Sequence, residues 1–417
     1  MAKNYLSDIY PSRLLDFQKE RYLSLSQKFF DTFGTNPTMF FSAPGRTEIC
    51  GNHTDHQNGK VLAASISLDI IAAVLPTDDG IVHIKSEGYD FEEVDLNDLR
   101  IKKHEKNTSK ALIRGVARGF ADRSYKIGGF KAYTTSNVLK GSGLSSSAAF
   151  EVLIGTILNG LYNDYSVSDV EIAKIAQFSE NVYFGKPSGL MDQMASSVGN
   201  FICIDFKNPK NPVIETINFD FNASGHSLCV IDTKGSHADL TPEYASIPRE
   251  MHDIAEYFKV DVLRQVSKAD IIKSYAHLRQ KFGDRAVLRA LHFVDCNERV
   301  QKEFNALITG DFNTFLSLVN ESGDSSYKYL QNVFAPSFPK EQGLSTALYI
   351  AKDILGDTGA CRVHGGGFAG TIQAFVPDDK LHTFIESMEN VFGNSCCYVL
   401  DIRTVGGTEI IFDKYKE

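Results

Sequence analysis

The sequence lacks a long apolar run and an excess of positive charge. Its longest apolar stretch, residues 61–76, is interrupted by Ser65, Ser67 and Asp69, and is too short and too polar to span a bilayer. The formal net charge is −9, whereas a nucleic-acid surface needs clustered lysine and arginine. We therefore expect neither a membrane nor a nucleic acid as a partner.

The sequence also lacks a cysteine framework and a secretory leader. The 7 cysteines, an odd number, show neither disulfide spacing nor a Cys-x-x-Cys metal pattern. The N-terminal segment has no apolar run followed by a small-residue cleavage site, so we predict no signal peptide. The adjacent Cys396 and Cys397 allow a redox switch, but their apolar surroundings favour a buried strand. These features predict a reducing, cytoplasmic location.

The chain of 417 residues is long enough for two domains, or for one large α/β unit with insertions. Helical periodicity predicts a helix over residues 12–33, and a capping pair, Ser168 with Glu171, predicts another that ends near Gly185. Strand-like runs occur in both halves. We therefore predict a mixed α/β (α+β) fold with an N-terminal domain over residues 1–205 and a C-terminal domain over residues 206–417. The expected strands are residues 39–42, 70–75, 81–86, 129–134, 201–205, 227–232, 371–375 and 397–403.

The first of three unusual segments is SAPGRTEICGNHTDHQNGKVL, residues 42–62. Dense polar side chains on a loop between two apolar strands suit a ligand rich in hydroxyl groups, because each hydroxyl needs a matched partner once it leaves water. A metal site built on the two histidines and an ordinary polar turn are the alternatives. The polar residues are Arg46, Glu48, Asn52, His53, Asp55, His56 and Gln57.

The second segment, KGSGLSSSAAFE at residues 140–151, is a Gly/Ser loop that leads into an apolar helix. The free N–H groups and positive dipole end of a helix N-terminus bind phosphate, and serine hydroxyls add ligands for phosphate or Mg²⁺. The segment is neither a Walker A loop nor a dinucleotide fingerprint. A flexible connection is the alternative interpretation of this loop taken alone.

The third segment, GACRVHGGGFAGTIQAF at residues 359–375, places three consecutive glycines before an alternating strand. Glycines in this position indicate a backbone that approaches another group closely. Alone, this segment predicts a tight turn. Together with the second segment, it could close over a nucleotide phosphate or pack under the active site.

In this order and spacing, the three segments resemble the signature motifs of the GHMP kinases. GRTEICGNHTDHQ in the first segment and GLSSSAAFEV in the second are similar to the galactokinase versions. The resemblance covers nearly the whole chain. It implies a fold of two α/β domains with the active site between them.

The resemblance also implies roles for individual residues. SGLMDQMASSVG is similar to the family's catalytic stretch, which makes Asp192 the catalytic aspartate and Arg46 its partner in stabilising charge. Mg²⁺ is implied at Glu180 and at a serine of the second segment, for which Ser146 is preferred, with Ser145 and Ser147 close by. The implied sugar-binding residues are Arg46, Asn52, His53, Asp55, Gly189, Asp192 and Tyr244, and the implied ATP-binding residues are Gly141, Ser142, Gly143, Leu144, Ser145, Ser146 and Ser147.

The implied reaction is phosphoryl transfer from ATP to the anomeric C1 hydroxyl of galactose, with Mg²⁺ bridging the phosphates. An aspartate near a helix start stays ionised and is a weak base, so whether Asp192 removes the proton or mainly orients the hydroxyl stays open. The expected partners are a small sugar and ATP. We expect a monomer or a weak homodimer.

The main departure from the family pattern is Asn52, where galactokinases usually carry a glutamate that lies near the sugar's C6 hydroxyl. Loss of that charge removes repulsion against a carboxylate at C6, so a galacturonokinase is an alternative, and the pair His56 and Gln57 also looks like the plant form of that enzyme. His364 replaces a usual threonine. A sugar and ATP sensor without turnover is a third possibility, but the complete phosphate loop favours an enzyme.

Overall fold

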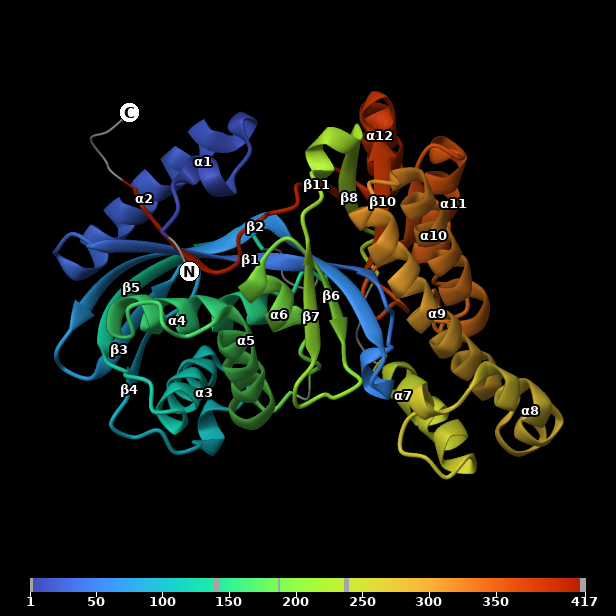
Figure 1. The fold of residues 1–417 in the computed structure, drawn as a ribbon. Coiled ribbons are helices and arrows are strands. Elements are labelled where there is room, and N and C mark those ends of the chain that lie inside the picture. The colour runs from blue at the N-terminus through green and yellow to red at the C-terminus, as the bar shows by residue number, and fades with distance from the viewer. Residues whose placement is uncertain (1–2, 139–142, 187, 236–239, 413–417) are drawn as a thin grey trace.

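The computed structural model describes residues 3–138, 143–186, 188–235 and 240–412. Two sheets lie side by side in it, each with its own helices (Figure 1). The first sheet has 8 strands, with six in the order β12-β1-β2-β5-β3-β4, while β6 pairs with β2 and β7 with β6. Its strands are β1 (Met39–Cys50), β2 (Lys60–Thr77), β3 (Ile81–Ser86), β4 (Phe91–Asp95), β5 (Gly129–Ser136), β6 (Phe201–Asp205), β7 (Val213–Ile217) and β12 (Thr408–Ile410).

Helices cover both faces of the first sheet (Figure 1). On one face lie α3 (Ser109–Asp122), α4 (Ser146–Tyr162), α5 (Asp169–Phe178) and α6 (Met191–Val198). On the other lie the short α1 (Leu6–Ile9) and α2 (Leu15–Phe33), whose Tyr22, Leu25 and Phe29 are buried against the sheet. Because both faces are covered, nearly every residue of β1 and β2 is buried, which explains why most of β2 appears in the sequence as an apolar run rather than as an alternating pattern.

The second sheet has 4 strands in the order β11-β8-β10-β9. These are β8 (His226–Asp232), β9 (Ala360–Val363), β10 (Thr371–Pro377) and β11 (Cys397–Leu400), and α11 (Gly343–Leu355) and α12 (Leu381–Phe392) pack against them. The long α9 (Asp284–Ile308) and α10 (Phe312–Ser325) lie beside this sheet, while α7 (Thr241–Tyr257) and α8 (Lys268–Phe282) extend below it (Figure 1).

The pairing of β1 with β2 is irregular where it matters most for the site. The antiparallel register shifts between Pro44 and Arg46 and again between Glu48 and Cys50. Such bulges bend a strand and redirect its side chains. Beyond the second irregularity, the two strands extend toward α7 and α9, so their connecting turn lies beside the C-terminal half of the chain (Figure 1).

The structure confirms the mixed α/β class and refines several elements. The predicted helix over 12–33 begins as a 3-10 turn at Ser12–Leu14, before α2. Ser168 caps α5 as expected, since its hydroxyl accepts from the Glu171 amide at 3.3 Å. The predicted helix after Ser168 ends at Gly185 as expected, where φ is 86°, but α5 itself stops at Phe178 and gives way to a wider π turn at Ser179–Phe184.

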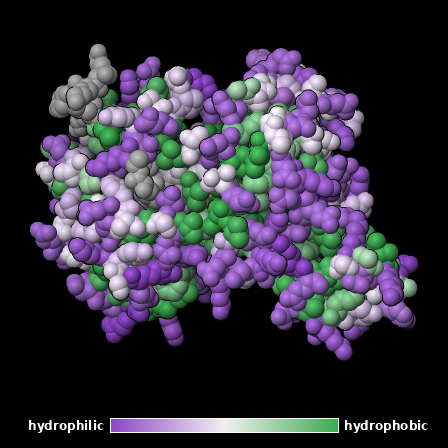
Figure 2. Space-filling view, viewed as in Figure 1, coloured by the Kyte–Doolittle hydropathy of each residue, from purple (hydrophilic) through white to green (hydrophobic). Residues whose placement is uncertain are grey.

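Cys396 is buried, as expected, and Cys397 begins β11, but Cys397 is only half-buried. The boundary near residue 205 stays a prediction, and two strands from beyond it, β7 and β12, belong to the first sheet. The surface is mostly hydrophilic in the view of Figure 2. Among the helices of the described residues, we find none that combines the length and apolar character needed to span a bilayer.

Candidate active site

An ion pair between Arg46 of β1 and Asp192 of α6 lies at the centre of the predicted site. Arg46 Nε donates to Asp192 Oδ1 at 2.7 Å, and the Arg46 guanidinium also donates to the carbonyl oxygen of Gly143. Ser145 Oγ donates to the other carboxylate oxygen of Asp192 at 2.6 Å. Three stretches that are far apart in sequence therefore meet at one carboxylate. They are the first segment, residues 42–62, here called the sugar segment; the second segment, residues 140–151, here called the phosphate loop; and the catalytic stretch, residues 188–199.

The surroundings of Asp192 keep it ionised. Burial tends to raise its pKa, but the charge and hydrogen bond of Arg46, together with the Ser145 hydroxyl, lower the pKa below its ordinary value. Asp192 is also the second residue of α6, where the positive end of the helix dipole favours a carboxylate. The expectation that Asp192 is ionised and a weak base agrees with this geometry.

The described part of the phosphate loop enters α4 through a strained residue. Ser145 has a φ of 58°, in the left-handed region, and α4 begins at the next residue, Ser146. The first N–H groups of a helix have no partner within it, so they are available to an anion. Gly143 and Leu144 contact the sugar segment, since the Leu144 carbonyl accepts from the Arg46 amide at 3.1 Å. The predicted ligands Gly141 and Ser142 lie outside the described residues.

Glu180, in the π turn after α5, is surrounded by hydrogen-bond donors. Its Oε1 accepts from Ser147 Oγ at 3.0 Å and from Lys186 Nζ at 3.1 Å. Its Oε2 accepts from Ser188 Oγ at 2.6 Å and from Gln193 Nε2 at 2.7 Å. Of the loop serines, Ser147 is therefore the one seen against Glu180, while Ser146 as a Mg²⁺ ligand stays a prediction.

The oxygen atoms at this place suit Mg²⁺, which binds one or two carboxylates and completes its coordination with phosphate and water. Glu180 supplies a carboxylate and Ser147 a hydroxyl at the start of α4. Among the residues that the structure describes, no group of three or more His, Cys, Asp or Glu side chains is placed to hold a metal. Nearby, burial first and the charge of Glu180 second raise the pKa of Glu151 well above its ordinary value.

The turn that follows β1 brings His53, Asp55 and Gly189 together. His53 has a φ of 58°, and its Nε2 lies 3.1 Å from the carbonyl oxygen of Gly366. Burial, and then the neighbouring His56, lower the pKa of His53 to about 4. A Cβ atom at Gly189 would overlap Asp55 Oδ2, so any larger residue there would displace that carboxylate.

Asn52 is fully buried, and its side chain is engaged by other protein groups. Its Nδ2 donates to Glu48 Oε1 at 2.7 Å and to the carbonyl oxygen of Gly365 at 2.6 Å. Its Oδ1 accepts from Asn332 Nδ2 at 2.6 Å.

The expectation that the polar side chains project from a loop was wrong for Arg46 and Glu48, which lie in β1 because the strand continues to Cys50.

The triple-glycine segment forms a wall against Tyr244 of α7. The Tyr244 hydroxyl donates to the carbonyl oxygen of Gly367 at 2.8 Å, and its ring meets Phe368 edge to face at 5.3 Å. A Cβ at Gly366 would lie 2.7 Å from the Tyr244 ring. The close backbone approach that the glycines predicted is therefore present.

His364 connects the glycine segment to the other two segments. Its Nε2 lies 3.1 Å from Thr47 Oγ1, and its Nδ1 lies 3.0 Å from Thr371 Oγ1. A Cβ at Gly143 would lie 3.2 Å from His364 Nδ1. Burial, followed by the charge of Arg46, lowers the pKa of His364 to about 3, so the imidazole is neutral at physiological pH.

Several residues of this site were missed by sequence reasoning. Gln193 directly follows the predicted Asp192, and Lys186 and Ser188 precede the predicted Gly189, so their position in the chain was a usable signal. Asn332 offered no such signal, because it lies between two helices and far in sequence from every motif.

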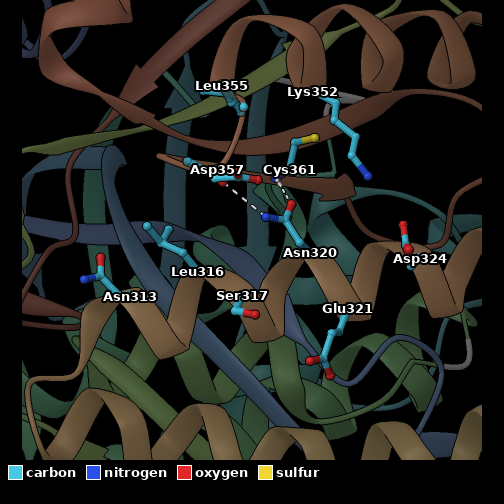
Figure 3. Close-up of a pocket in the computed structure, with 12 residues that line it drawn as sticks. Asn313, Leu316, Ser317, Asn320, Glu321, Asp324, Lys352, Leu355, Asp357 and Cys361 are labelled. Carbon is cyan, nitrogen blue, oxygen red and sulfur yellow. Dashed lines mark hydrogen bonds between the residues drawn. The ribbon is translucent and has the colours of Figure 1, made fainter.

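A separate pocket of about 390 Å³ lies between α10, α11 and the turn before β9. Figure 3 shows its polar lining, with Asn320 at the base, where its amide donates to the Gly359 carbonyl oxygen at 3.1 Å and accepts from the Cys361 amide at 3.1 Å. None of the predicted site residues lines this pocket. The candidate active site is therefore defined by converging side chains and not by this cavity.

Comparison with known proteins agrees with the arrangement of the three segments. The family described as "GHMP kinases N terminal domain" matches residues 111–200, and the "Galactokinase galactose-binding signature" matches residues 27–76. The chain is 30% identical to a galactokinase of Streptomyces coelicolor, over 88% of this chain and 92% of that protein. It is 32% identical to a galactokinase of Glaesserella parasuis, over 86% and 91% respectively.

Solved structures show the same fold. The galactokinase of Lactococcus lactis, solved with galactose, matches with a TM-score of 0.79 at 24% identity, over 93% of this chain and 99% of that one. The mevalonate kinase of Methanococcus jannaschii matches with a TM-score of 0.62 at 14% identity, over 87% and 98%. The predicted family and fold are confirmed. This chain belongs to the galactokinase family of GHMP kinases, and it is a sugar kinase, a phosphotransferase.

Proposed function

We propose that this enzyme transfers the γ-phosphoryl group of ATP to the anomeric C1 hydroxyl of galactose, giving galactose 1-phosphate and ADP. The observation that carries the proposal is the convergence on Asp192, which accepts from Arg46 at 2.7 Å and from Ser145 at 2.6 Å. A kinase must hold an acceptor hydroxyl in line with a phosphoryl group, and these contacts join the sugar segment to the phosphate loop.

Galactose as the acceptor is supported by the family comparison and by the turn after β1. The galactose-binding signature spans residues 27–76, which include Arg46, His53 and Asp55. The relatives at 30% and 32% identity are galactokinases, and the Lactococcus lactis enzyme was solved with galactose. We propose the predicted sugar contacts at Gly189 and Tyr244 as well.

In the proposed reaction, Asp192 holds the C1 hydroxyl and accepts its proton as the new bond to phosphorus forms. Its lowered pKa makes it a weak base, so orientation of the hydroxyl is its larger contribution. Arg46 is positioned to neutralise the developing charge on the acceptor oxygen and the transferred phosphoryl group. The N-terminus of α4, with Ser145 and Ser146, binds the phosphates of ATP.

We propose Glu180 and a loop serine as the protein ligands of Mg²⁺. The Ser147 hydroxyl, 3.0 Å from Glu180 Oε1, supports Ser147 beside the predicted Ser146. When bound, Mg²⁺ neutralises charge on the β- and γ-phosphates. Lys186 and Gln193 hold the Glu180 carboxylate in one orientation for this role.

A turnover assay with purified protein, ATP and Mg²⁺ tests the proposal, with galactose and galacturonate as parallel acceptors. We expect efficient formation of galactose 1-phosphate and little product from galacturonate. Strong turnover of galacturonate with little turnover of galactose would contradict the proposal and would identify a uronic acid as the substrate. Binding of both ligands without any product would point to a sensor.

A further inference from the structure

The amide of Asn52 lies in a buried chain of hydrogen bonds that joins the sugar segment to the glycine segment. Its nitrogen donates to Glu48 Oε1 at 2.7 Å and to the Gly365 carbonyl at 2.6 Å. Its oxygen accepts from Asn332 Nδ2 at 2.6 Å, and the same nitrogen of Asn332 donates to the Gly366 carbonyl at 3.1 Å. Asn52 and Asn332 are both 0% exposed.

The contacts themselves determine how the two amides are oriented. Backbone carbonyl oxygens can only accept, so the group of Asn52 that faces Gly365 must be its nitrogen, and the same holds for Asn332 and Gly366. The oxygen of Asn52 then faces the nitrogen of Asn332. The Asn52 amide is therefore matched on both sides, to acceptors through its nitrogen and to Asn332 through its oxygen. Asn332 makes both of its contacts through Nδ2, and its buried Oδ1 has no hydrogen-bond partner among the described residues.

A carboxylate at position 52 does not fit this arrangement. It would place an oxygen against the carboxylate of Glu48 and against the carbonyl oxygen of Gly365, where the amide nitrogen now donates to both. Buried acceptors without a donor are costly, and two adjacent buried carboxylates cost more. The buried cluster already contains one carboxylate, that of Glu48, which lies 3.4 Å from Arg362.

We infer that Asn52 is a positioning residue, which pairs with Glu48 and Asn332 to hold the His53 turn against the glycine segment and does not contact the substituent at C6 of the sugar. The inference rests on the proposed function for its choice of sugar. Galactokinases usually have a glutamate at this position, and the asparagine here is explained by its hydrogen bond to the buried Glu48. The presence of Asn52 therefore does not by itself indicate that the substrate is a uronic acid.

An isosteric double-mutant cycle tests the inference with Asn52→Asp, Glu48→Gln and the two together. Asn52→Asp alone should raise the KM for galactose about tenfold or more while the KM for ATP stays unchanged, because a buried donor becomes an acceptor. Glu48→Gln alone should change the KM for galactose less than Asn52→Asp does. The double variant should recover part of the loss, because the amide introduced at position 48 can donate to the carboxylate at position 52.

The control for the cycle is Asn313→Asp, the same chemical change at an exposed position of α10. We expect no change in either KM for this variant. Two results overturn the inference. One is additivity of the two single substitutions in the KM for galactose; the other is an effect of Asn52→Asp that falls on galacturonate while galactose is unaffected.

Unfolding of the same four proteins by denaturant, without any substrate, separates this inference from the proposed function. We expect the effects of Asn52→Asp and Glu48→Gln on the free energy of unfolding to be non-additive, like their effects on the KM for galactose. Coupling in unfolding without coupling in KM would give Asn52 a purely structural role and would overturn the inference. If the wild type phosphorylates neither sugar, the proposed function fails, and additive free energies of unfolding would then overturn the inference independently.

Discussion

Ser145 and Asp192, 47 positions apart in sequence, share a hydrogen bond of 2.6 Å between the phosphate loop and α6. The same carboxylate pairs with Arg46 at 2.7 Å. Ser145, just before α4, and Arg46 of β1 therefore hold one acidic group. This shared carboxylate gives the site its most direct test.

Replacement of Asp192 by asparagine should lower kcat at least about a hundredfold, because it removes the carboxylate that we propose orients the acceptor hydroxyl and takes its proton. The isosteric change keeps the contact with Ser145 possible, so the fold should be retained. Steady-state kinetics with galactose measures the effect, and thermal unfolding checks the fold. Unchanged phosphorylation by Asp192→Ala would refute the proposed mechanism.

Ser147→Ala should raise the Mg²⁺ concentration needed for half-maximal activity severalfold, because the Ser147 hydroxyl contacts Glu180 at 3.0 Å. Ser146→Ala is the matched comparison on the same helix turn. We expect a smaller shift from it. A Mg²⁺ titration of activity at saturating ATP distinguishes the two serines. A larger shift for Ser146→Ala than for Ser147→Ala would indicate that Ser146 is the metal ligand.

Gly189→Ala should weaken galactose binding about tenfold or more, since the added Cβ must displace the carboxylate of Asp55. The expected sign is a higher KM for galactose with little change in the KM for ATP. The two KM values, measured on the same preparation, provide the internal control. Equal loss in both would indicate a general disturbance of the fold rather than of the sugar site.

Stability should fall as the pH is lowered from 7 to 5, partly through His364. Burial, then Arg46, lowers its folded-state pKa from 6.5 to about 3, so between these values the unfolded chain binds more protons than the folded one. The contribution of neutral His364 to the free energy of unfolding is fully present above pH 6.5. It is lost as the pH falls from 6.5 toward 3, by up to about 1.4 kcal/mol per pH unit for this one histidine.

Denaturant unfolding across this pH range measures the slope. His364→Gln should flatten the dependence of the free energy of unfolding on pH, because the titrating group is removed. His382, whose side chain is 84% exposed, is the control, and its substitution should leave the slope unchanged. An identical slope in His364→Gln and the wild type would show that His364 is not a source of the acid sensitivity.

Local sequence was sufficient for the parts of the molecule that depend on near neighbours. The cap at Ser168 and the stop at Gly185 use groups within a few residues of each helix end, so the chain encodes them directly. The strands β3 and β6 have the bounds that their strand-like sequence predicted, residues 81–86 and 201–205. The family itself could be identified because its motifs are short and contiguous.

Contacts across the chain were decided only by the tertiary structure. β12 pairs with β1 although more than 350 residues lie between them, and Asn332 reaches Asn52 across 280 positions. Periodicity and spacing carry no information about such partners, because the geometry depends on how the two sheets and their helices pack. The sequence by itself determined the family, the three segments and the bounds of a few elements, such as β3 and β6. Packing decided which serine faces Glu180 and that the amide of Asn52 is enclosed by Glu48, Gly365 and Asn332, since hydrogen bonds in a buried cluster require groups from distant parts of the chain to meet in three dimensions.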